Sequence, residues 1–148
     1  MKTNSKVPEL LVSYSAHIVS EQEINNSRET YSLIFSHWNL DTIEIFEEVK
    51  ILLLNKSNKV LGVYDLSKGG MSSSIIDVKI VLSIALKSLA SGIIIVHNHP
   101  SGNLSPSKAD IDITKKLQSA CNLMDIKILD HLIISKDNYY SFTDDGLL

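Results

Sequence analysis

One short stretch constrains the fold of this 148-residue chain more than any other. Residues 93–96 read Ile-Ile-Ile-Val, and His97 and His99 follow them with one residue between. A short all-apolar run that comes after a helical pattern is typical of a buried strand in an α/β protein. Because side chains alternate along a strand, residues two apart share a face, and the sequence predicts that both imidazoles point the same way.

A loop rich in Pro, Gly, Asn and Ser follows, and a second helix is expected after it. Ser105 is the predicted N-cap of this helix, with Pro106 at the first helical position, where its missing N–H is no loss. Asp110 lies three residues after Ser107, so the two share a face of the first turn. Two imidazoles from a strand end and one carboxylate from a helix start are therefore expected to converge across one loop.

Hydrophobic periodicity predicts the remaining elements. Helices are expected from Ser27 onward, with Ser27 as the N-cap, and over 77–89. Strands are expected within 10–19 and over 49–54, 60–66, 93–97, 126–135 and 139–142. Gly92 suits the left-handed conformation that ends a helix. The polar turn at 55–59 indicates a hairpin, and a helix leading into a buried strand indicates a crossover with some parallel pairing. The predicted fold class is α/β, with a mixed β-sheet flanked by helices.

Composition narrows the class of protein. A hydrophobic content of 44% and a charged content of 21% are ordinary for a globular domain. The net charge of −3 argues against a protein whose main task is to grip a phosphate backbone. The single cysteine, Cys121, allows no intrachain disulfide, and charges interrupt the longest apolar region. We therefore expect a cytoplasmic protein without a membrane span.

The histidines and the aspartate suggest a metal site. His97, His99 and Asp110 supply the three ligands that a catalytic zinc usually takes, with one position left for water; nickel, cobalt or manganese would fit the same geometry. Ser107 beside Asp110 is predicted to donate its hydroxyl to a developing oxyanion. His131 is a candidate further ligand, although a structural or substrate-side histidine with a polar partner is the favoured interpretation.

Hydrolysis also needs a general base, which is usually a carboxylate beside the metal. Within residues 97–110 the only carboxylate is Asp110, the predicted ligand. The base must therefore come from elsewhere in the chain. The candidates are Glu44, Glu47 and Glu48, which precede the buried strand at 49–54.

These residues carry a resemblance to a known family. His97-x-His99, then Ser107 and Asp110, matches the JAMM motif of MPN+ domain metalloproteases in full. The sequence resembles the RadC family in three segments. These are His-Asn-His-Pro-Ser-Gly-Asn at 97–103, Asp-His-Leu-Ile-Ile at 130–134 and Tyr-Ser-Phe at 140–142. The resemblance covers most of the chain, from about Ser27 to the C-terminus.

The resemblance implies a JAB/MPN domain, an α/β architecture related to cytidine deaminases. It implies that His97, His99 and Asp110 bind zinc and that Ser107 aids the transition state. It selects Glu47 as the base, because the family's glutamate precedes a strand like that at 49–55. The expected activity is that of a JAMM-type zinc metallopeptidase, which hydrolyses a peptide or isopeptide bond of a peptide or protein substrate.

The chain also departs from the RadC pattern. Typical RadC proteins carry an N-terminal helix-hairpin-helix region for which this chain lacks room, so residues 1–148 are expected to form a single JAB/MPN-like domain, with 1–26 as an N-terminal extension. Residues 68–74 read Lys-Gly-Gly-Met-Ser-Ser-Ser where relatives often carry a Gly-Thr pair, which affects expectations about substrate contacts rather than about the metal.

The sequence also bears on three other functions. The alternative is a non-catalytic RadC-like accessory module in DNA repair or DNA processing. Nucleic acid as a partner is suggested only by the name of the family, because the sequence has no recognisable nucleic-acid-binding motif. A zinc nucleobase deaminase requires His-x-Glu and Pro-Cys-x-x-Cys, which a chain with one cysteine does not supply. The adjacent His-Asn-His does not match the dispersed spacing of HNH nucleases. The sequence carries no indication of the oligomeric state.

Overall fold

The computed structural model describes residues 7–8, 10–14, 20–69 and 76–148. Their strands form one five-stranded sheet in the order β2-β1-β3-β4-β5. The elements are α1 (Ser27–Ser36), β1 (Glu48–Leu54), β2 (Val60–Lys68), α2 (Val78–Lys87), β3 (Gly92–Asn98), α3 (Lys108–Asn122), β4 (Lys127–Ile134) and β5 (Tyr139–Ser141). Only β3 and β4 pair in parallel, and the other neighbouring strands are antiparallel.

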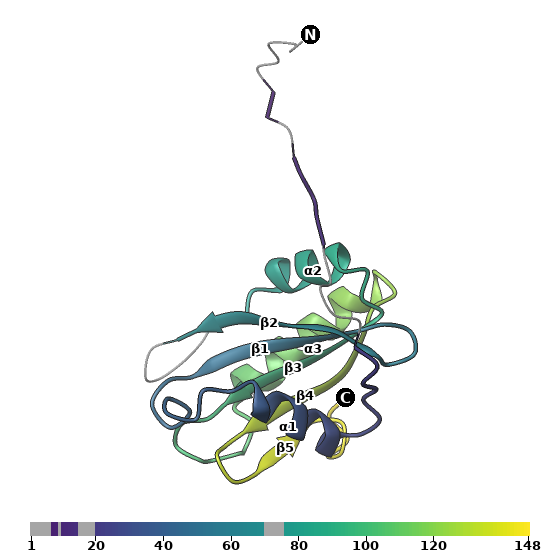
Figure 1. Cartoon of the computed structure of the whole chain (residues 1–148). Helices are drawn as coiled ribbons and strands as arrows, with labels where there is room; N and C mark the ends of the chain where they lie inside the picture. The colour runs from purple at the N-terminus through teal and green to yellow at the C-terminus, as the bar shows by residue number, and fades with distance from the viewer. Residues whose placement is uncertain (1–6, 9, 15–19, 70–75) are drawn as a thin grey trace.

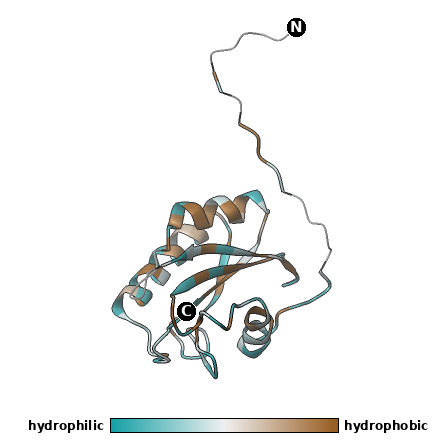
Figure 2. Ribbon diagram, turned by 60° about the vertical axis from the view of Figure 1, so that its left-hand side comes forward, coloured by the Kyte–Doolittle hydropathy of each residue, from teal (hydrophilic) through white to brown (hydrophobic). Residues whose placement is uncertain are grey.

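The helices cover both faces of the sheet, with α2 and α3 on one side and α1 on the other (Figure 1). Apolar residues of β1 and β3, among them Ile51 and Ile95, pack against α2 and α3, where Leu117 of α3 is fully buried. Alternate residues of the same strands pack against Ile34 and Trp38 near α1. Both strands are therefore apolar along most of their length, as the hydropathy colours in Figure 2 show, because neither face meets solvent.

Strand register decides which residues meet at the site. Val49 in β1 pairs with His97 in β3, and Ile95 in β3 pairs with His131 in β4. Since side chains alternate, His97 shares the face of Ile95 that packs against α2 and α3. The side chain of Asn98 points to the opposite face of the sheet, on the side of α1, as do those of Ile94 and Val96.

The predicted α/β class with a mixed sheet flanked by helices is confirmed, and it is consistent with a JAB/MPN-type fold. The hairpin at 49–66, the strands at 93–97, 126–135 and 139–142, and a parallel pair joined by a helix all match the prediction. The predicted strand within 10–19 is wrong for residues 10–14, and residues 15–19 lie outside the described part, as do residues 70–74 of the departing segment.

Three predicted helix boundaries are wrong for local reasons. Asn26, not Ser27, caps α1, since its side chain accepts the Glu29 amide. Ser107, not Ser105, caps α3. The left-handed residue after α2 is Leu89, with φ of 55°, whereas Gly92 begins β3.

Gly92 has a packing reason for its small size. A Cβ atom on Gly92 would lie 2.7 Å from Leu129 Cδ1, so a larger residue here would displace the Leu129 side chain.

Candidate metal centre

The carboxyl end of β3 presents two imidazoles to one point in space. His97 is buried and His99 is half-buried, and their Nε2 atoms lie 3.0 Å apart. Residues 97 and 99 share a face because the strand geometry continues through Asn98 into the loop, where the His99 amide still bonds to the Ile134 carbonyl at 3.0 Å. The predicted convergence of the histidines is therefore present.

The first turn of α3 brings a carboxylate to the same point. Asp110 Oδ1 lies 3.4 Å from His97 Nε2, and its Oδ2 lies 3.4 Å from His99 Nε2. A capping box fixes this carboxylate: Ser107 N donates to Asp110 Oδ2 at 2.8 Å, and Asp110 N donates to Ser107 Oγ at 3.1 Å. The position of Asp110 is thus set by the same bonds that begin the helix.

The ionised carboxylate of Asp110 and the protonated ring of His99 stabilise each other. Burial works to raise the pKa of Asp110, but hydrogen bonds from His97 and His99 outweigh it and hold that pKa well below its usual range. The hydrogen bond to Asp110 raises the pKa of His99, against the opposing effect of burial. In the metal-free protein a proton on His99 therefore sits among the groups that would otherwise hold a cation.

The donor set fits a divalent metal. Two imidazole nitrogens 3.0 Å apart repel each other unless a proton or a cation lies between them, and a carboxylate faces both. His99 Nδ1 lies 2.5 Å from the Asn103 carbonyl oxygen, which can only accept a hydrogen bond, so Nδ1 carries the hydrogen. In the neutral ring the lone pair is then on Nε2, which can bind a metal. Two nitrogens and one hard oxygen suit zinc.

A glutamate approaches the histidines from the start of β1. Glu47, His97 and His99 each offer one ligand atom, and these atoms all lie within 4.8 Å of one another. The antiparallel pairing of Val49 with His97, continued by two residues, brings position 47 opposite His99. Glu47 thus lies on the histidine face of the sheet.

The other two candidate bases are engaged elsewhere. Glu48 lies one residue along, on the opposite face, and pairs with Lys68 at 3.1 Å. Glu44 is exposed and lies 3.9 Å from Lys136. Of the three, Glu47 alone therefore offers a ligand atom within 4.8 Å of those of both histidines.

Two residues that sequence reasoning overlooked support the site from behind. Asn98 is fully buried, and its amide nitrogen donates to the carbonyls of Ile43 (2.6 Å) and Phe46 (2.7 Å). Thr114 is buried one turn after Asp110, and its hydroxyl lies 2.6 Å from His131 Nδ1. Their signal in the sequence was spacing alone: Asn98 between the histidines, and Thr114 four residues after the aspartate.

His131 contacts His97 rather than the point where the ligands converge. Its Nε2 lies 2.7 Å from His97 Nδ1, on the far side of that ring, and its own ring stacks on Phe142 with centroids 4.6 Å apart. Burial, followed by the charge of His97, lowers the pKa of His131 well below its ordinary value. His131 is therefore a buried neutral partner of His97, in line with the favoured structural interpretation.

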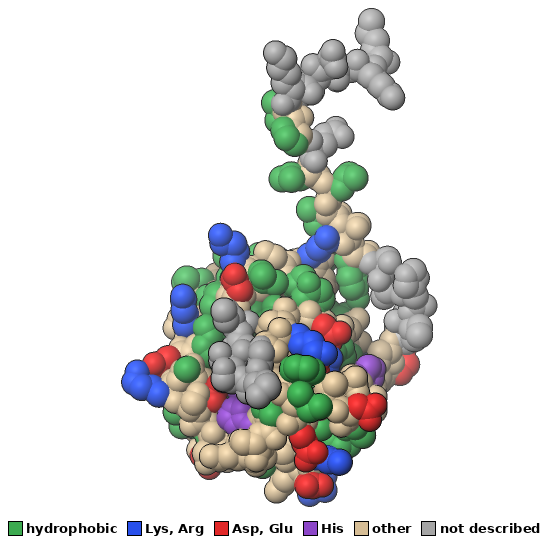
Figure 3. All heavy atoms as spheres, turned by 90° about the vertical axis from the view of Figure 1, so that its left-hand side faces the viewer, with side chains coloured by type: hydrophobic (Ala, Val, Ile, Leu, Met, Phe, Trp, Pro, Cys, Tyr) green, Lys and Arg blue, Asp and Glu red, His purple; other side chains and the backbone are tan. Residues whose placement is uncertain are grey.

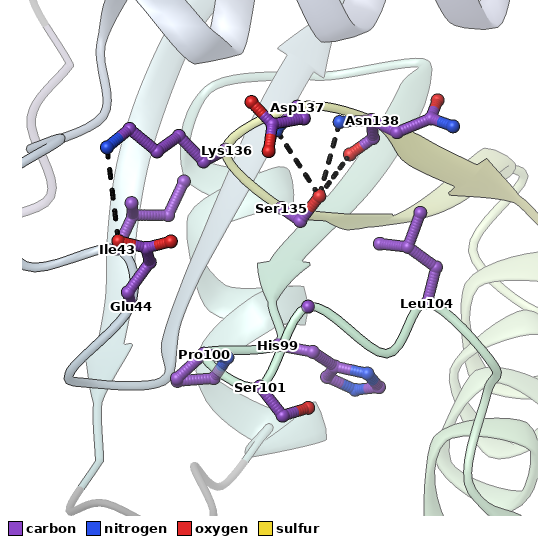
Figure 4. Close-up of a pocket in the computed structure, with 11 residues that line it drawn as sticks. Ile43, Glu44, His99, Pro100, Ser101, Leu104, Ser135, Lys136, Asp137 and Asn138 are labelled. Carbon is purple, nitrogen blue, oxygen red and sulfur yellow. Dashed lines mark hydrogen bonds and ion pairs between the residues drawn. The ribbon is translucent and has the colours of Figure 1, made fainter.

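A pocket of about 340 Å³ opens beside His99 (Figure 4). The 99–104 loop forms one wall, the turn at 135–138 another, and Ile43 and Glu44 a third. On the face shown in Figure 3, Lys and Arg side chains are interspersed with Asp and Glu, and no basic patch forms among the described residues of that face. The pocket beside His99 itself carries charges of both signs, with Glu44, Lys136 and Asp137 among its lining residues.

Comparisons with known proteins agree with the site motif. The family model of the RadC-like JAB domain matches residues 24–147. The chain is 52% identical over 101 residues to a UPF0758 protein of Flavobacterium johnsoniae, covering 68% of this chain and 44% of that protein. It is 42% identical over 135 residues to a UPF0758 protein of Porphyromonas gingivalis, covering 90% and 58%.

The chain spans about half the length of the curated relatives that it matches, at 44% and 58% of these two proteins. Among the described residues, none of the helices has the length and apolar character needed to cross a membrane.

Proposed function

Because this chain belongs to the family of RadC-like JAB domains, we propose that it is a zinc-dependent metallohydrolase that cleaves a peptide or isopeptide bond. One observation carries the proposal. His97, His99 and Asp110 converge on one point, and Glu47 approaches the same histidines from β1. This arrangement combines three metal ligands with a separate carboxylate, which is the set that amide hydrolysis requires.

The residues have distinct roles in this mechanism. His97, His99 and Asp110 hold the metal, which when bound lowers the pKa of water to about 7 and polarises the substrate carbonyl. Glu47 accepts a proton from the attacking water as the oxygen adds to the carbonyl carbon. Glu47 then delivers the proton to the amide nitrogen, the C–N bond breaks, and an acid and an amine leave.

Ser107 assists the same step. Its Oγ accepts the Asp110 amide at 3.1 Å, so the hydroxyl proton is available to the oxyanion that develops on the substrate. The pocket beside His99 gives an extended peptide a route to the site, with Lys136 and Asp137 among its walls. A peptide or protein is therefore the proposed substrate class.

The test combines metal content with hydrolysis. We expect about one zinc per chain in the purified wild type and negligible zinc in His97→Ala. We expect wild-type zinc in His37→Ala, a control at an exposed histidine at the end of α1, on the other side of the sheet from α3. Hydrolysis is measured with an internally quenched peptide library and with peptides joined through a lysine ε-amino group. Negligible zinc in the wild type after incubation with the metal would overturn the proposal.

A result with zinc bound and neither probe cleaved favours the alternative of a non-catalytic accessory module in DNA processing. That alternative requires binding to duplex DNA that weakens steeply with salt and survives Asp110→Ala. The absence of binding at low salt would remove it.

A further inference from the structure

The nitrogen of His97 that faces away from the proposed metal contacts a buried chain of polar groups. His97 Nδ1 lies 2.7 Å from His131 Nε2, and both rings are almost fully buried, at 1% and 0% exposed. One of these two nitrogens must donate and the other accept, because two lone pairs at this distance repel. The direction of this bond decides which nitrogen of His97 is free to bind a metal.

The next group in the chain fixes the direction. Thr114 Oγ1 lies 2.6 Å from His131 Nδ1 and donates to the Asp110 carbonyl oxygen, also at 2.6 Å. A hydroxyl has one proton, and a carbonyl only accepts. With its proton on the Asp110 carbonyl, the Thr114 hydroxyl accepts from His131, so His131 carries its hydrogen on Nδ1.

The protonation of His131 in turn decides that of His97, its next hydrogen-bond partner. A fully buried ring stacked on Phe142 is neutral, because burial of an uncompensated charge is costly, and it carries one hydrogen only. The His131 Nε2 is then an acceptor, and His97 donates to it from Nδ1. When the His97 ring is neutral, its lone pair is therefore on Nε2, the atom that faces Asp110 and His99.

We propose that Thr114 and His131 are positioning residues that hold His97 as the tautomer with hydrogen on Nδ1 and a metal-binding lone pair on Nε2. Its consequence for the metal rests on the proposed function, whereas the tautomer itself does not. The series of hydrogen bonds begins at His97 and ends at the backbone carbonyl of Asp110, which lies in α3 with Thr114. Both ends are therefore proposed metal ligands. The bonds therefore fix the orientation of His97 relative to α3 as well as its hydrogen.

The first experiment reads the tautomers directly in the metal-free protein. Long-range ¹H–¹⁵N NMR spectra of the labelled full chain distinguish Nδ1–H from Nε2–H in each ring. We expect both His97 and His131 to carry hydrogen on Nδ1. A hydrogen on Nε2 of His131 would mean that Thr114 donates in the opposite direction, and it would overturn the inference.

The second experiment measures zinc affinity by competition with a chromophoric chelator. Thr114→Val keeps the shape but removes the acceptor for His131, and we expect zinc to bind about 10- to 100-fold more weakly, the usual effect of losing such a partner. Thr114→Ser restores the hydroxyl, and we expect most of the affinity to return. Zinc affinity equal to wild type in Thr114→Val would overturn the inference.

A matched control separates positioning from general damage. Thr30 is also buried, and its hydroxyl bonds to the carbonyl four residues earlier, that of Asn26, at 3.3 Å, but it lies in α1 away from the histidines. Thr30→Val should leave zinc affinity and both tautomers as in wild type. If wild-type protein binds no zinc, the proposed function fails, while the NMR assignment still decides the inference.

Discussion

The side chain of Asn98 accepts a hydrogen bond from the backbone amide of Glu48 at 2.7 Å. Asn98 stands between the two histidines in sequence but faces the other side of the sheet, where it also holds the carbonyls of Ile43 and Phe46. One residue of the His-x-His segment therefore fixes the backbone on either side of Glu47. The proposed ligands and the proposed base are joined by a single buried amide.

This link predicts the effect of Asn98→Ala. The variant leaves three backbone groups without their partner, two in buried hydrogen bonds and one in a part-buried hydrogen bond, and each costs about 1–3 kcal/mol when water does not replace the side chain. We expect lower stability toward denaturant and a larger loss in hydrolysis than in zinc affinity, because Glu47 loses its position while the imidazoles remain. Asn122→Ala, at an exposed position near the end of α3, is the matched control and should unfold like wild type. Equal losses of zinc and activity in Asn98→Ala would contradict the prediction.

The two neighbouring glutamates give a sharper test of the base. Glu47→Gln should lower kcat about 10²- to 10⁴-fold, the usual contribution of a general base, while zinc content stays at the wild-type level. Glu48→Gln, on the opposite face and paired with Lys68, should leave kcat within a few-fold of wild type. Zinc content and kcat are measured on the same preparations. A loss of zinc in Glu47→Gln would make this residue a ligand instead of the base.

The convergence of the two histidines and Asp110 could be predicted for a physical reason. A strand, a loop and a capped first turn are local structures, and their side-chain directions follow from sequence spacing. Sequence spacing also left Glu44, Glu47 and Glu48 open, because the face of each residue depends on the pairing of β1 with β3. That register is a tertiary property, and in the structure the alignment of Val49 with His97 separates the three, in agreement with the choice of Glu47 that the resemblance implied.

The sequence predicted a polar partner for His131, but the identity of that partner could not be predicted, for the same reason. Thr114 and His131 lie on a helix and a strand whose contact depends on how α3 packs on the sheet. Gly92 illustrates a local signal that misleads. A glycine after a helical pattern suggested a helix end, whereas in the structure Gly92 begins β3 and lies close to the Leu129 side chain. Local signals predicted the elements well and the contacts between them poorly.

Zinc affinity should depend on pH with a definite sign. In the metal-free protein the hydrogen bond to Asp110 raises the pKa of His99 above its ordinary 6.5. Zinc needs the neutral ring, so protons compete with the metal below the raised pKa and stop competing above it. We therefore expect affinity to fall as pH drops from 8 toward 6, with proton uptake by the buffer on binding. Calorimetry in buffers of different ionisation enthalpy measures it, and pH-independent affinity over this range would contradict the prediction.

Gly102 gives a prediction about the loop that orients His99. Its φ of +80° lies in the left-handed region, and its amide donates to the His99 carbonyl at 2.9 Å. A Cβ atom there meets no atom within 4 Å, so the cost of Gly102→Ala is conformational, about 1–2 kcal/mol. Because the turn brings the Asn103 carbonyl to His99 Nδ1, we also expect weaker zinc binding.

The control for this variant is Gly62→Ala in β2, where a Cβ atom also has open space and φ is not in the left-handed region. Gly62→Ala should keep wild-type zinc affinity and stability, since a strand accepts alanine without strain. Denaturant unfolding and chelator competition on both variants separate the two effects. If Gly102→Ala lost stability but kept full zinc affinity, the loop would support the fold without orienting His99.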